Sequence, residues 1–193
     1  MSGTVGADET FIGDLEKNKY EDKSPHKGRG PVGKTIVVGV LKRAEDEGAN
    51  SKVWAKVAQN TSKKTLHAEI RKKVSTSSEL YTDAWNGYQG LTPECIHKFV
   101  DHAVAHALGQ VRTNGLENFR ALLKRCLKGT SISVEPFHLF RNPDEEVFRF
   151  NNRGENGGGR FNMVASAIAG KRLTYDELTS SYLACHDEVM PRA

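Results

Sequence analysis

The sequence has few cysteines and no long apolar run, and both absences argue against whole classes of protein. Three cysteines occur in 193 residues, none of them in a C-x-x-C pair. That usage argues against a zinc ribbon or a disulfide framework and fits a reducing cytoplasm. No stretch approaches the roughly 18 apolar residues of a membrane span, and the N-terminus lacks a basic-then-apolar leader. We therefore expect a cytoplasmic protein with no membrane partner.

Net charge is also small, at +4, and alone it does not indicate a nucleic-acid partner. Its distribution is more informative, because residues 23–44 contain six cations and no acid. These cations are Lys23, Lys27, Arg29, Lys34, Lys42 and Arg43. A local excess of this kind fits a phosphate-binding segment. A merely solvated basic loop is the alternative.

The apolar pattern predicts one α/β domain. An apolar content of 37% and a length of 193 residues suffice for a well-buried core. Alternating and continuous apolar runs predict strands at residues 4–12, 35–41, 52–57, 79–83 and 96–104. Helical spacing predicts one helix that starts at residue 61 and a second at 114–129. A third helical region lies within 134–153, where Asn142 is expected to cap a fresh start. A loop at 155–159 is then followed by a short packed helix at 161–169. We place the domain at 1–170 and a weakly structured tail at 171–193.

The segment from Asn114 to Arg125 is the most informative part of the chain. Its apolar residues recur as one stripe of a helix, and Glu117 and Lys124 lie seven residues apart, which is two turns. A carboxylate and an ammonium on one side of a docked helix suggest a site. The alternative is that Asn114 and Glu117 form a capping box, which would contribute about 1 kcal/mol to helix stability and imply no chemistry.

Two further acids lie on predicted strands. Asp8 and Glu9 are neighbours, so they point to opposite faces, and Glu9 shares its face with the apolar residues of its strand. Asp8 is therefore the preferred site candidate. Asp83 ends the strand 79–83, where it can reach a ligand beyond the sheet; as an alternative it caps the segment that follows. Acids on two strands and a following helix are what a two-metal phosphoryl-transfer site needs.

Five ordered blocks resemble the ISXO-type transposase domain of bacterial insertion sequences, a branch of the DDE transposases. The blocks are GADETFIG (6–13), GRGPVGK (28–34), YTD (81–83), TNGLENF with LLKR (113–125) and FRFNNR (148–153). The similarity spans residues 4–161. It agrees with the order of the predicted elements, which is that of the RNase H-like fold: a mixed five-stranded sheet, three antiparallel strands plus two parallel ones, flanked by helices.

The resemblance implies a metal-binding triad of Asp8, Asp83 and Glu117, with Lys124 as the basic residue two turns beyond the last acid. It implies Mg²⁺ or Mn²⁺, two ions being expected, and DNA cleavage and strand transfer in insertion-sequence transposition. The expected partners are double-stranded DNA, as element ends and target, and further copies of the chain on that DNA, at the nucleoid of a bacterial cytoplasm. Candidate DNA contacts are Lys27, Arg29, Lys34, Asn114 and Arg125.

Two departures from the family pattern bear on activity. An aromatic residue commonly follows the Phe of the last-acid helix, where this chain has Arg120, and Pro143 falls just before the FRFNNR block in a helix that is usually unbroken. One alternative is therefore an inactive, truncated transposase remnant that only binds DNA. Another is a stand-alone RNase H-like nuclease, which a comparison of an RNA–DNA hybrid with DNA ends would distinguish.

Overall fold

A computed structural model describes most of the chain. The described residues are 1–13, 34–46, 48–83, 86–88, 90–91, 95–100, 114–129, 134 and 138–179, with the main chain alone for Asp83, Asn86, Phe99, Val100, Asn114 and Thr179. The segment from 14 to 33, in which several basic candidates lie, is outside these ranges. Across the described residues, no helix combines the length and apolar character needed to cross a membrane.

Five strands form one mixed sheet in the order β3-β2-β1-β4-β5. They are β1 Thr4–Ile12, β2 Thr35–Lys42, β3 Lys52–Ala58, β4 Glu79–Asp83 and β5 Ile96–Val100. β1, β2 and β3 pair antiparallel, whereas β4 pairs parallel to β1 and β5 pairs parallel to β4. The predicted RNase H-like arrangement, three antiparallel strands extended by two parallel ones, is confirmed. Residues 101–104 of the last predicted strand lie outside the described ranges.

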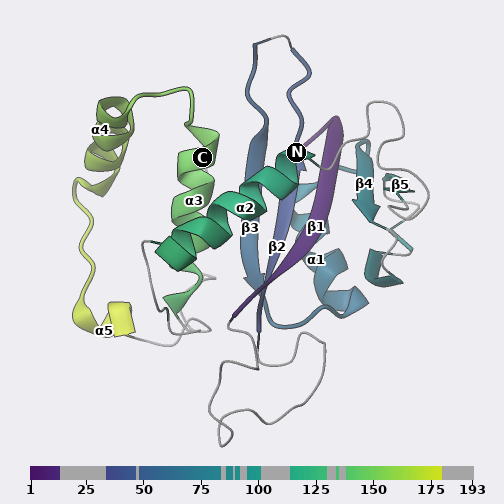
Figure 1. Ribbon diagram of the computed structural model, residues 1–193, viewed down its shortest axis with the longest axis horizontal. Coiled ribbons are helices and arrows are strands. Elements are labelled where there is room, and N and C mark those ends of the chain that lie inside the picture. Colours follow the sequence, from purple (N-terminus) through teal and green to yellow (C-terminus); the bar gives the residue numbers. More distant parts are fainter. Residues whose placement is uncertain are drawn as a thin grey trace, which may run out of the picture.

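Helices cover both faces of the sheet (Figure 1). On one face, α1 (Lys63–Lys73) buries Leu66 and Ile70 against a core of alternating strand residues such as Val5, Ala7, Val38 and Val40. Ser62 precedes α1, and its Oγ accepts a hydrogen bond from the Thr65 amide at 3.4 Å. The helix therefore begins at Lys63 and not at the predicted residue 61, because the Ser62 side chain supplies the cap.

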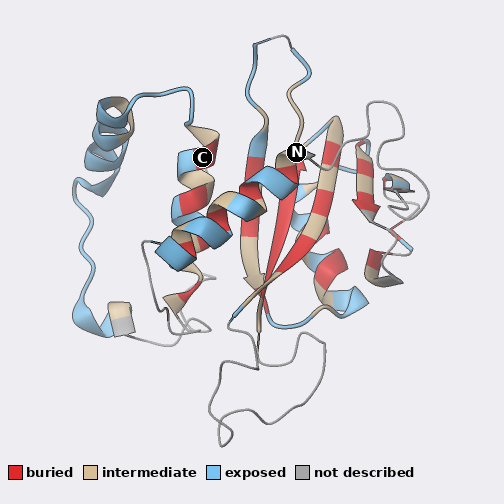
Figure 2. Ribbon diagram, viewed as in Figure 1, coloured by how far each residue is buried: buried red, intermediate tan, exposed pale blue. Residues whose placement is uncertain are grey.

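On the other face, α2 (Asn114–Gly129) crosses the sheet and packs with α3 (Arg141–Asn151) (Figures 1 and 2). The Phe119 and Phe150 rings meet edge to face, with centroids 5.7 Å apart. Gly39 in β2 lets α2 approach, since a Cβ there would lie 3.0 Å from Leu116 Cδ1. The core of this face consists of Val37, Leu41, Val53, Ala55, Leu116, Phe119, Leu123, Leu127, Leu139 and Phe150.

The last residue of α3 forms hydrogen bonds to the edge strand β3. Asn151 Nδ2 donates to the Val53 carbonyl at 2.8 Å, and the Val53 amide donates to Asn151 Oδ1 at 2.7 Å. The side-chain amide thus pairs with β3 as a neighbouring strand would. The predicted cap at Asn142 is wrong, because α3 begins at Arg141. Pro143 lies in its first turn, where no amide hydrogen is needed, so the helix starts ahead of it.

The segment after α3 departs from the sequence predictions. α4 (Gly157–Ile168) begins inside the predicted 155–159 loop, because Asn156 Oδ1 caps it by accepting from the Gly159 amide at 2.8 Å. None of its residues is buried, so the predicted packing is wrong (Figure 2). Phe161, for example, is 71% exposed. α5 (Tyr175–Thr179) is a single short turn, and the 170/171 domain boundary stays a prediction.

Candidate active site

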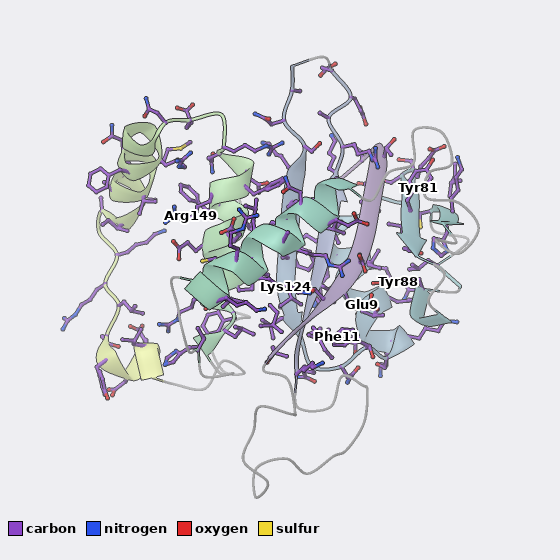
Figure 3. The ribbon with its side chains drawn as sticks, viewed as in Figure 1. Glu9, Phe11, Tyr81, Tyr88, Lys124 and Arg149 are labelled. Atoms are coloured by element: carbon purple, nitrogen blue, oxygen red, sulfur yellow. The ribbon has the colours of Figure 1, made fainter. Side chains whose placement is uncertain are left out.

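The side chains of the two neighbouring acids of β1, Asp8 and Glu9, point to opposite faces of the sheet. Glu9 is buried on the α1 side, where the Tyr88 hydroxyl donates to Glu9 Oε2, and the two side chains lie close together in Figure 3. Asp8 is on the α2 side and contacts that helix. The alternation of β1 therefore assigns Glu9 to the core and Asp8 to the α2 face, as its apolar neighbours predicted, and the metal-binding role of Asp8 stays a prediction.

An arginine of α2 meets Asp8 across the interface between helix and sheet. Arg120 Nη1 donates to Asp8 Oδ2, and both side chains are largely enclosed. Sequence reasoning noted Arg120 only as a departure from the family pattern and missed this contact. The residues are 112 positions apart, so no local spacing could reveal the pair. The available signal was an arginine one turn beyond Glu117, on a helix already expected to carry the site.

Lys124 lies one turn further along α2, over β1 (Figure 3). The pKa of its ammonium is lowered, first by desolvation and then by the positive charges of Arg120 and Lys128, with Lys34 adding to the effect. The negative charge of Asp8 acts in the opposite direction and raises this pKa. Lys124 and Lys34, two predicted site residues, thus belong to one electrostatic neighbourhood that also contains Asp8.

Asp83 is the last residue of β4, the parallel neighbour of β1. The pairing of these strands extends to Gly6 with Tyr81. If the same register continued for two more residues, the Asp83 main chain would be level with Asp8, but the observed pairing ends at Gly6 and Tyr81. The side chain of Asp83 lies outside the described part of the structure, so its approach to Asp8 stays a prediction.

Glu117 occupies the first turn of α2 and is exposed. It precedes Arg120 by three residues, so the two side chains project from neighbouring positions on the helix. α2 begins at Asn114, close to the predicted start, but the Asn114 side chain is not described and the capping-box alternative stays open. The DNA contact of Asn114 and the metal-binding role of Glu117 therefore remain predictions.

The donor set suits a hard divalent cation. Carboxylate oxygens are the ligands that Mg²⁺ and Mn²⁺ prefer. Thr10, on the Asp8 face of β1, is 2% exposed, and its Oγ1 has no hydrogen-bond partner among the described residues. Within the described side chains, which do not include Asp83, no three carboxylate, imidazole or thiolate groups are arranged to hold a metal.

The predicted DNA-contacting cations are only partly described. Lys34 leads into β2, and Arg125 is exposed on α2. Lys27 and Arg29 lie outside the described ranges. On the sheet face opposite Asp8, Thr82 Oγ1 and His97 Nε2 lie 2.8 Å apart. Sequence reasoning did not assign this pair to the site. Desolvation, followed by the charge of His67, lowers the pKa of His97, so this imidazole is neutral at physiological pH.

Comparison with known proteins agrees with this architecture. The model of the ISXO2-like transposase domain matches residues 1–151, which covers the whole sheet, α1, α2 and α3. A protein of Haemophilus influenzae described as an uncharacterized transposase-like protein is 36% identical over 103 residues, or 52% of this chain and 82% of that protein. With its sheet order, its α2 helix and the matched span, the chain belongs to the family of ISXO2-like transposase domains.

Proposed function

We propose that this domain cleaves DNA and joins DNA strands as the catalytic part of an insertion-sequence transposase. Asp8, Asp83 and Glu117 would hold two Mg²⁺ or Mn²⁺ ions. Bound ions of this kind supply an activated water or 3′-hydroxyl and stabilise the leaving oxygen. The observation that carries the proposal is the position of Asp8, which faces the helix that bears Glu117 and Lys124.

The parallel pairing of β1 and β4 supports the triad. Crossover connections bring the ends of parallel strands to one edge of a sheet, where ligands commonly bind. Asp83 ends β4, the neighbour of β1, while α2 carries the Arg120 that contacts Asp8 on β1. Each acid thus comes from a different element, and rigid neighbouring elements can hold such side chains in a fixed relative position.

Lys124 and Lys34 would bind the DNA backbone. Each is a compact positive charge. Desolvation is the first cause of the lowered pKa of the Lys124 ammonium, and repulsion by neighbouring cations, Lys34 among them, lowers it further. A phosphate group between them would relieve that repulsion, since it supplies the missing negative charge. Arg125, Lys27, Arg29 and the helix start at Asn114 would extend the contact to element ends and target. Further copies of the chain would assemble on that DNA, at the nucleoid of a bacterial cytoplasm.

The test is metal-dependent nicking of supercoiled plasmid by the purified chain. Asp8→Asn, Asp83→Asn and Glu117→Gln should each reduce nicking in Mg²⁺ or Mn²⁺ to the level seen with EDTA. Asp46→Asn, an exposed acid in the turn between β2 and β3, is the matched control and should nick like the wild type. Thermal unfolding of each variant checks that the fold survives. Nicking that persists in Asp83→Asn would contradict the proposed triad.

A second candidate function is non-specific DNA binding without catalysis. The contact between Arg120 and Asp8 favours it, because that carboxylate already has a cationic partner. This function predicts no nicking in either metal and binding that weakens steeply with salt. The salt slope should fall by about 0.9 for each phosphate contact removed, so Lys34→Gln and Lys124→Gln should each lower it by about that amount.

A further inference from the structure

A cation of the chain itself lies against the acid proposed to bind metal. Arg120 Nη1 donates to Asp8 Oδ2, with 29% of the Arg120 side chain and 15% of the Asp8 side chain exposed. The ion pair between Arg149 and Glu145 on α3 is far more open, at 58% and 54%. Because water and salt screen an enclosed pair less, Arg120 holds its carboxylate more firmly than a surface arginine does.

The surroundings reinforce this contact. Arg120, Lys124 and Lys128 are spaced four residues apart, so they follow one another along one side of α2, and the charges of Arg120 and Lys128 both act on Lys124. Asp8 is the acid that offsets this positive charge at Lys124. A divalent cation approaching Asp8 therefore meets a guanidinium on the carboxylate and further positive charge along the helix.

We propose that Arg120 is a built-in counter-ion of Asp8 that competes with divalent cations for this carboxylate. The inference rests on the proposed function, since it takes Asp8 as a metal ligand. An oxygen that accepts a hydrogen bond from the guanidinium is not free to coordinate, and a cation entering beside it is repelled. Asp8 becomes available when Arg120 turns to another anion. A DNA phosphate is suitable, because the guanidinium fork fits phosphate as well as carboxylate.

Direct titration of the DNA-free chain with Mn²⁺ tests this competition, with free Mn²⁺ measured by electron paramagnetic resonance. Arg120→Gln should bind Mn²⁺ about fivefold more tightly than the wild type, the upper range for losing an ion pair of partial exposure. Arg120→Leu, which removes the hydrogen-bonding group entirely, should do the same. The matched control is Arg71→Gln, which removes the same charge from an exposed site on α1, on the other face of the sheet, and should leave the affinity unchanged.

Asp8→Asn separates the two proposals. It should abolish the tight Mn²⁺ site in the wild type and in Arg120→Gln alike. If Asp8→Asn abolishes binding but both Arg120 variants match Arg71→Gln, the counter-ion role is overturned while the metal site stands. If Asp8→Asn has no effect on Mn²⁺ binding in any background, the metal site and the counter-ion role both fail. Thermal unfolding confirms that each variant is folded at the titration temperature.

Discussion

The contact between Asn151 and β3 gives the most direct test of how this fold is held together. Asn151→Ala removes two hydrogen bonds, of 2.7 and 2.8 Å, to the main chain of Val53. Each contributes about 1 kcal/mol to the free energy of unfolding, so the variant should lose about 2 kcal/mol. For a chain of this length the melting temperature should fall by about 4–8 °C.

Urea unfolding and differential scanning calorimetry measure this loss, and the next residue supplies the control. Among the described residues, Asn152 Nδ2 donates to one acceptor, the Phe148 carbonyl of the preceding turn, at 2.9 Å, so Asn152→Ala should lose about 1 kcal/mol at most. Asn151→Asp keeps the acceptor but places an oxygen against the Val53 carbonyl, and should destabilise at least as much as Asn151→Ala at neutral pH. Equal stabilities for Asn151→Ala and Asn152→Ala would refute the view that Asn151 acts as a strand partner.

Three further substitutions test the α2–α3 layer. Phe119→Ala should cost about 3–5 kcal/mol of unfolding free energy, measured in urea, because the ring is 1% exposed and packs on Phe150. Burial raises the pKa of the Glu146 carboxyl above its ordinary value, so the folded state binds the proton more tightly, and stability falls as pH rises through the raised pKa. Glu146→Gln should therefore exceed the wild type in stability at pH 7 and lose that advantage near pH 4. Glu145→Gln, in an exposed ion pair with Arg149, should change stability by less than about 1 kcal/mol.

Local patterns were sufficient to predict the sheet and the face of the sheet to which Asp8 points. β1 alternates apolar and polar residues, and β2 is a continuous apolar run, so their positions follow from burial alone. Glu9 shares a face with Val5 and Ala7, which assigns it to the core and Asp8 to the other side. These inferences succeeded because each depends on residues within one strand.

Features that join distant segments could not be predicted in this way. The Arg120–Asp8 contact and the Asn151–Val53 pairing link residues 112 and 98 positions apart, and neither leaves a periodic signal in the sequence. The apolar spacing of α4 predicted a helix correctly, but spacing cannot tell whether a neighbour covers it. The Asn142 cap was wrong because Pro143 is tolerated within the first turn of α3, so the helix begins ahead of it.

The distance along the chain between Asp8 and Arg120 has a consequence for synthesis in the cell. At roughly 5–20 residues per second, a ribosome needs about 6–22 seconds to add the 112 residues that separate them. During that interval β1 and β2 can already pair, while Arg120 has not yet been added. The nascent domain therefore passes through a stage in which Asp8 lacks its Arg120 partner, and it gains that partner only after the chain has grown into α2.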